Sequence, residues 1–208
     1  MASIAKDFNH GSGLWIGEQV IIEPEVVVGN NVKIGHRVTL KSGTIIKDNS
    51  IIDDHCITTG ACIIGNHVNI RTGAIISKST IIEDYTFVGP GVVTNHTKHV
   101  IHGRFDKMED IQQLTYIGYG SILGSQVSIV AGVKTVPQVV VGAGAVVVKD
   151  ILEPGVYIGF PARKISDLSE EYRIEEPENS GRIYLEGEIL HHLQAHIPGL
   201  KVDDKYRR

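Results

Sequence analysis

The sequence has little of several features that mark particular classes of protein. Basic and acidic residues nearly balance, 20 against 24, so no positive excess favours binding to nucleic acid or to an anionic membrane. Two cysteines cannot build a disulfide framework, and their scarcity is typical of a reducing compartment. The N-terminal segment lacks the apolar stretch of a signal peptide, and no apolar run is long enough to cross a membrane. We therefore expect a cytoplasmic protein without nucleic-acid or membrane partners.

Aromatic residues are also few, at 6% of 208 residues, whereas isoleucine and valine are abundant and 23 glycines are present. Hydrophobic residues make up 42% of the chain, and the mean hydropathy is +0.03. Such a chain can bury a core and is not disordered. The length suits one domain with at most a small appendage, and the core must be built from small and branched side chains.

An aliphatic residue recurs every six positions, and this is the most informative pattern in the sequence. One phase holds over the hexad positions from Ile16 to Thr94, almost all of them aliphatic. The residue four places later is small or β-branched at every step from Val20 to Val92. After a break, the pattern resumes in a new phase from Ile117 to Val147, with its partners from Ser121 to Ile151. This regularity predicts a repeated structural unit.

A period of six with two inward positions is the signature of a parallel β-helix. Glycine often follows the aliphatic residue, and because glycine tolerates turn dihedrals we expect it to form a turn in each hexad. Three hexads would close one triangular coil, so the hexads from Ile16 onward predict roughly six to seven coils. An all-β sandwich is the alternative, but its alternation at period two and its wider turn spacing do not match.

Three segments depart from the repeat and define the predicted organisation. Residues 1–15 form a lead-in, residues 16–165 the β-helix, and residues 166–208 a partly helical tail. Residues 95–116 interrupt the coils with a polar, charged loop, and since stacking needs no such loop we expect it to be functional. An open solenoid end would allow edge-to-edge growth, so we expect the tail to cap the prism or to contact other subunits.

The most specific stretch of sequence runs from IGYGSILGSQ through VGAGAVVVKD to GFPARKI. It resembles the closing coils of the hexapeptide-repeat acyltransferases, above all the sugar and nucleotide-sugar acetyltransferases, and the resemblance extends over residues 16–165. The resemblance implies a left-handed β-helix, a homotrimer with active sites between subunits, and acetyl-CoA as co-substrate without a metal. The acceptor would be a sugar or a nucleotide-linked sugar, and no motif separates N-acylation from O-acylation.

Five residues match positions at which this family binds coenzyme A. Ser125 and Ala143 would offer main-chain groups to the pantetheine, because corners built from small residues leave backbone edges accessible. Lys149, Arg163 and Lys164 would meet the phosphates. The alternative interpretation is that these three cations are ordinary solvated surface charges.

The loop contains His96, His99 and His102. Sugar O-acetyltransferases, which the chain also resembles, carry a catalytic histidine where their coils give way to an equivalent loop, and aligning the loops places His96 there. Related N-acetyltransferases have aspartate at this point, so Thr94-Asn95-His96 lies between two patterns. His96 is the predicted general base, with His99 and His102 as alternatives, and Asn95 or a loop carboxylate would orient its ring. The candidate carboxylates are Asp106, Glu109 and Asp110.

Two other functions fit a hexapeptide prism. The γ-class carbonic anhydrases share it, but their zinc histidines include a pair five residues apart, and the repeat region of this chain has no such pair. A noncatalytic trimeric scaffold would leave the histidine loop and the PARKI closure unexplained. Cys56 and Cys62 occupy inward positions on consecutive faces of one coil, so we expect buried, unbonded and unreactive thiols.

Overall fold

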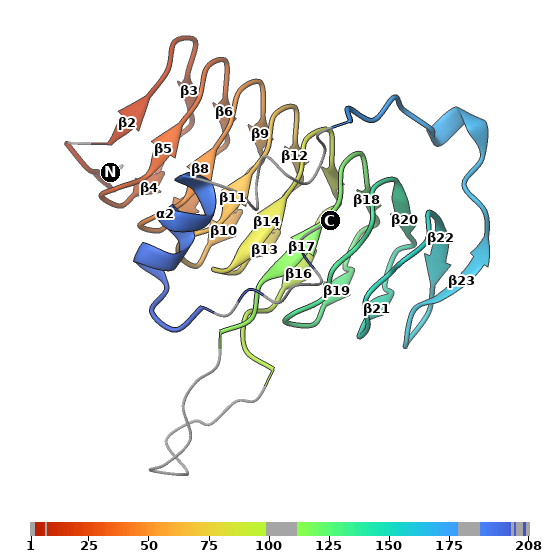
Figure 1. Ribbon diagram of the computed structural model, residues 1–208. Helices are drawn as coiled ribbons and strands as arrows, with labels where there is room; N and C mark the ends of the chain where they lie inside the picture. The colour runs from red at the N-terminus through yellow and green to blue at the C-terminus, as the bar shows by residue number, and fades with distance from the viewer. Residues whose placement is uncertain are drawn as a thin grey trace.

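The computed structural model describes residues 3–6, 8–98, 112–178 and 188–200, together with Val202 and Tyr206. The chain winds as a parallel β-helix, in which short strands of successive coils stack into three sheets that form the sides of a prism (Figure 1). We call these sheets A, B and C in the order in which the chain first meets them. The predicted all-β fold class is confirmed.

The strands recur in the order A, B, C along the chain as far as β19, and beyond it only sheets A and C gain strands. The counts that follow refer to the described residues. Sheet A has eight strands: β1 (Ser3–Ile4), β4 (Ile21–Ile22), β7 (Thr39–Leu40), β10 (Ile57–Thr58), β13 (Ile75–Ile76), β16 (Val93–Thr94), β19 (Ser128–Ile129) and β21 (Val146–Val147). Sheet B has six: β2 (Asn9–His10), β5 (Val27–Val28), β8 (Ile45–Ile46), β11 (Ile63–Ile64), β14 (Thr80–Ile82) and β17 (Thr115–Ile117). Sheet C has nine: β3 (Trp15–Ile16), β6 (Lys33–Ile34), β9 (Ile51–Ile52), β12 (Asn69–Ile70), β15 (Phe87–Val88), β18 (Ile122–Leu123), β20 (Val139–Val141), β22 (Gly155–Ile158) and β23 (Arg163–Ser166). Neighbouring strands pair in parallel except β22 and β23, whose antiparallel pairing ends sheet C.

Three corners connect the sheets, and we number them in chain order: corner 1 joins A to B, corner 2 joins B to C, and corner 3 joins C to A. Sheet A contributes one strand to each coil, so the described residues form eight coils. The sequence predicted six to seven because residues 1–15 were assigned to a lead-in. Strands β1 and β2 instead pair with β4 and β5, so this segment already belongs to the first coil.

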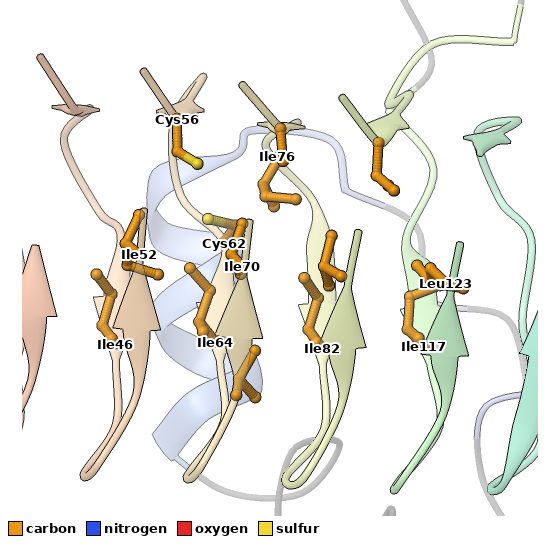
Figure 2. Close-up of a cluster of buried hydrophobic side chains, with 14 of the residues drawn as sticks. Ile46, Ile52, Cys56, Cys62, Ile64, Ile70, Ile76, Ile82, Ile117 and Leu123 are labelled. Atoms are coloured by element: carbon orange, nitrogen blue, oxygen red, sulfur yellow. The ribbon is translucent and has the colours of Figure 1, made fainter. Parts of the chain in front are cut away.

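The inward positions of the hexads line the prism. Ile46, Ile64, Ile82 and Ile117 are at most 1% exposed, and they stack one above another in successive coils (Figure 2). Strand pairing holds this register, since Ile64 lies opposite Ile46 on one side and Ile82 on the other. Branched side chains fill such a column at high density, because each contacts the same position in the coils above and below.

Cys56 and Cys62 lie within this core as free thiols (Figure 2). Burial raises the pKa of Cys56 to about 11 and that of Cys62 to about 12. The thiolate is the reactive form, so neither side chain is a nucleophile at neutral pH. The prediction of two buried, unbonded cysteines is confirmed.

The glycines that follow the aliphatic position have a role other than the predicted one. Gly118 and Gly124 do not have a positive φ. A Cβ on Gly118 would lie 2.5 Å from the carbonyl carbon of Val136, so glycine is needed there for close stacking of coils. The left-handed residue comes two places later in the hexad, as at Gly73 (φ 72°) and Tyr85 (φ 58°). The prediction that the earlier glycines supply the turn dihedrals was wrong.

The C-terminal segment turns back along the prism. After the 3₁₀ turn η1 (Glu170–Tyr172), the chain contacts corner 2, where the Tyr119 hydroxyl donates to the carbonyl of Glu175 at 2.9 Å. Helix α2 (Glu188–His196) then lies beside the N-terminal half of the prism, near β8 and β11 (Figure 1). Its Leu193 packs with Ile63, Ile81 and other outward residues of sheet B into a second buried cluster. The helix therefore covers a side of the prism and not its open end.

Candidate active site at two corners of the prism

Corner 3 is a continuous column of stacked turns. A backbone hydrogen bond joins each turn to the next. In the first, the N–H of Arg37 donates to the carbonyl of Glu18 at 2.8 Å, and in the last, the N–H of Gly144 donates to the carbonyl of Ser125 at 2.8 Å. The residues on successive rungs are Glu18, His36, Asp54, Thr72, Pro90, Ser125 and Ala143. The column therefore begins with ionisable side chains and ends with small ones.

Both predicted main-chain contacts of coenzyme A lie on the later rungs of this column. Ser125 and Ala143 are exposed and one coil apart. The turns approach closely, because a Cβ on Gly124 would lie 2.6 Å from the amide nitrogen of Ala143. Small side chains at this corner leave backbone groups within reach of a thin ligand. A pantetheine arm, which carries two amides, is such a ligand.

The predicted catalytic residues lie at corner 1, directly after β16. His96 is half-buried, and its carbonyl accepts the N–H of Gln113 at 3.1 Å across the base of the loop. The side-chain amide of Asn95 donates to the carbonyl of Ile129 at 2.9 Å, and its own carbonyl accepts the hydroxyl of Thr115 at 3.0 Å. Asn95 thus anchors the chain to the next coil beside His96.

The three predicted phosphate contacts differ in their surroundings. Lys149 follows β21 at corner 1 and is exposed. Arg163 is exposed at the start of β23, and its Nη1 donates to the carbonyl of Ala162 at 3.0 Å. The ammonium of Lys164 instead pairs with Asp167 at 2.8 Å and Glu153 at 3.3 Å. Hydrogen bonding to Asp167 raises the pKa of Lys164, which is thus already engaged by two carboxylates.

Within one chain, the structure does not bring the two halves of the predicted site together. Corner 1, with His96, and corner 3, with Ser125 and Ala143, are the opposite edges of sheet A. A site that uses both corners therefore needs two copies of the chain. The predicted alternatives His99, His102, Asp106, Glu109 and Asp110 lie outside the described residues.

Sequence reasoning missed a buried carboxylate. Glu83 is 1% exposed and accepts hydrogen bonds from the hydroxyl of Tyr116 and from the backbone N–H of Tyr119. Glu83 follows Ile82 directly, at the hexad position where several other coils have a glycine that allows close stacking. The carboxylate at that position was the signal in the sequence that could have indicated this contact, because a carboxylate buried there must accept hydrogen bonds from donors in the next coil.

Among the described residues, no group of three or more histidine, cysteine, aspartate or glutamate side chains is arranged to hold a metal ion. In the same part of the chain, no helix has the length and apolar character needed to span a membrane.

Comparisons with known proteins agree with this architecture. The family model described as the GMPPB C-terminal domain matches residues 8–108. No curated protein sequence matches the chain significantly.

Solved structures are similar at low sequence identity. NeuO, a polySia-specific acetyltransferase, is 18% identical with a TM-score of 0.54, and the match covers 84% of this chain and 93% of NeuO. AntD, an N-acyltransferase from Bacillus cereus, is 19% identical with a TM-score of 0.52, over 75% of this chain and 84% of AntD. The acetyltransferase domain of PglB from Neisseria gonorrhoeae is 18% identical with a TM-score of 0.41, and the match covers 79% of this chain but 58% of that one. The chain has the left-handed parallel β-helix fold of NeuO and AntD.

Proposed function

We propose that the protein is an acyl-CoA-dependent acyltransferase that moves an acetyl group from acetyl-CoA to a hydroxyl or amino group of a sugar or nucleotide-linked sugar. The observation that carries this proposal is the exposed run of small residues at corner 3, where Ser125 and Ala143 leave backbone groups accessible on successive coils. The likeness to AntD, whose structure contains dTDP and coenzyme A, supports the same choice of substrates.

The active enzyme would be a homotrimer, because the two halves of the site lie at different corners. If corner 1 of one prism meets corner 3 of its neighbour, threefold symmetry repeats this contact and forms three identical clefts.

Coenzyme A would lie along corner 3 in each cleft. The pantetheine amides would meet backbone groups at Ser125 and Ala143. Lys149 from corner 1 of one copy and Arg163 from the last coil of the other would hold the phosphates at the C-terminal end of the cleft. Lys164 would make no contact with phosphate, because its ammonium is already paired with Glu153 and Asp167.

His96 would act as general base in the transfer step. The acceptor oxygen attacks the thioester carbonyl as its proton passes to the imidazole, and the acyl–oxygen bond forms. The carbon–sulfur bond then breaks, and the imidazolium returns the proton to the sulfur, so that coenzyme A leaves as the thiol. A sugar hydroxyl is far too weak an acid to ionise unaided, whereas a neutral imidazole can accept its proton during the attack. An amine acceptor, once deprotonated, would depend less on the base.

Release of coenzyme A tests the proposal directly. Acetyl-CoA is incubated with the protein and a panel of nucleotide-linked amino sugars and free sugars, and the free thiol is measured. We expect at least one acceptor to give turnover well above the hydrolysis seen without acceptor. Absence of turnover with every acceptor, together with no binding of coenzyme A by calorimetry, would contradict the proposal and favour a noncatalytic trimeric scaffold.

A further inference from the structure

The first rungs of corner 3 form a pocket at the opposite end of the column from Ser125 and Ala143. Glu18, Gln19, His36, Arg37 and Asp54 line a cavity of about 200 Å³. This end of the corner has no part in the acyl-CoA contacts described above. It lies on the same edge of the prism, and in the proposed trimer it would open onto the same cleft.

Hydrogen bonds hold the lining side chains in place. The N–H of His36 donates to Oδ1 of Asp54 at 2.7 Å, and Nδ1 of His36 accepts the N–H of Glu18 at 3.0 Å. Nε of Arg37 donates to Oε1 of Gln19 at 2.8 Å. The pocket is thus a fixed arrangement of donors and acceptors in neighbouring coils.

An exposed tryptophan lies next to this pocket. The ring of Trp15 meets the ring of His36 edge to face, with centroids 5.8 Å apart. Trp15 is 50% exposed, although it is the largest apolar side chain in the protein. A tryptophan that keeps one face open beside polar groups offers an apolar surface with hydrogen-bonding partners at its edge.

The chemistry of the lining selects a neutral polyhydroxylated ring. Two carboxylates, one guanidinium, one imidazole and one amide supply both donors and acceptors, as ring hydroxyls require. The two carboxylates disfavour a phosphate or a sugar acid in the pocket itself, because like charges repel. The exposed face of Trp15 would stack against the carbon–hydrogen face of such a ring.

The distance along the column determines the size of the ligand. Four steps separate the rung of His36 from that of Ser125, which at the spacing of stacked strands is about 19 Å. One hexose does not span that length. We infer that this pocket is an acceptor subsite that holds a neutral hexosyl or ribosyl unit at the far end of an extended acceptor, while the group to be acylated lies near Ser125. This inference rests on the proposed acyltransferase function.

Intrinsic fluorescence tests the subsite without any activity assay, since Trp15 is the only tryptophan in the chain. The full-length protein is titrated with glucose, maltohexaose and UDP-glucose, with correction for nucleotide absorbance. We expect a saturable change with maltohexaose or UDP-glucose at about tenfold lower concentration than with glucose. Response to maltohexaose alone identifies an oligosaccharide acceptor, and response to UDP-glucose alone identifies a nucleotide-linked one.

Two matched variants localise the signal. His36→Asn keeps a side-chain oxygen for the N–H of Glu18, as Asn30 does for the N–H of Ser12 at 2.9 Å, but removes the ring from the pocket. His67→Asn makes the same change at corner 2, at an exposed residue. We expect His36→Asn to raise the dissociation constant about tenfold and His67→Asn to leave it within about twofold.

Three results would overturn the inference: no saturable response to either extended probe, equal weakening by both variants, or binding of glucose as tight as that of the extended probes. Calorimetry with coenzyme A separates this outcome from failure of the proposed function. Sugar binding without coenzyme A binding would support the acceptor subsite and contradict the proposed acyltransferase function. Coenzyme A binding without a fluorescence response of Trp15 would support the acyltransferase function and contradict the subsite.

Discussion

A double-mutant cycle measures whether helix α2 is docked on sheet B in solution. Leu193 on the helix and Ile63 on β11 are both 0% exposed and belong to the same buried cluster. Replacement of either by alanine removes buried methyl groups and leaves a cavity, which costs about 2–5 kcal/mol of unfolding free energy. Because the two side chains share one packing site, the double variant should lose less than the sum, with a coupling of about 1–2 kcal/mol.

Ile64 provides the matched control, since it is the next residue on the same strand and is also 0% exposed, but it points into the prism. Ile64→Ala combined with Leu193→Ala should be additive within about 0.5 kcal/mol. The assay is urea unfolding at one fixed protein concentration, because the stability of an oligomer depends on concentration. Additivity of Ile63→Ala with Leu193→Ala would refute the packing of the helix on sheet B.

Three further predictions concern the stability of the coils and the binding of the cofactor. Gly118→Ala should lower the unfolding free energy by about 3 kcal/mol, because its Cβ would lie 2.5 Å from the backbone of the next coil. Gly73→Asn is the control, since no atom lies within 4 Å of its Cβ, and it should change the unfolding free energy by under about 0.5 kcal/mol in the same urea assay. The backbone N–H of Asn30, in the preceding coil, donates to the carboxylate of Asp48 and lowers its pKa. The stabilisation is therefore present above the ordinary aspartate pKa and is lost as pH falls through the lowered one, so Asp48→Asn should flatten the decrease in Tm from neutral pH to about pH 3. Lys149→Ala or Arg163→Ala should raise the KM for acetyl-CoA severalfold with little change in kcat, and the increase in KM should be smaller in high salt because salt screens the contact. An unchanged KM for both variants at low salt would refute the phosphate contacts.

The interior of the prism could be predicted from the sequence because its period is a property of the coil itself. Each coil contacts only its neighbours, so one inward residue such as Ile64 recurs at a fixed interval and is visible without knowledge of the rest of the chain. The outward position Ile63 carries no such signal. Its burial depends on Leu193, which is far away in sequence, and no local pattern encodes that contact.

The candidate site could be predicted only in pieces for a similar reason. Motif resemblance proposed His96 and Ser125, but it gave no account of the corner on which each lies. The structure places the two residues at opposite edges of sheet A, and this separation is the physical reason for proposing a site built from two chains. The role of Gly118 was misread because a glycine selected for close approach looks, in sequence, like one selected for its φ.

Complementation between two inactive variants tests the central claim that each active site is built from corner 1 of one chain and corner 3 of another. His96→Ala should lower kcat at least about a hundredfold and leave the KM for acetyl-CoA unchanged, because it removes the base. Ala143→Glu should abolish binding of acetyl-CoA, because it places a carboxylate on the exposed pantetheine track.

The measurement is coenzyme A release by trimers refolded from an equal mixture of these two variants, with the acceptor that the panel identifies. In a random mixture, a quarter of the composite clefts combine an intact corner 1 with an intact corner 3, so the account predicts about a quarter of the wild-type activity. A mixture no more active than the separate variants, with a trimer mass confirmed by sedimentation, would contradict it and place the site within one chain.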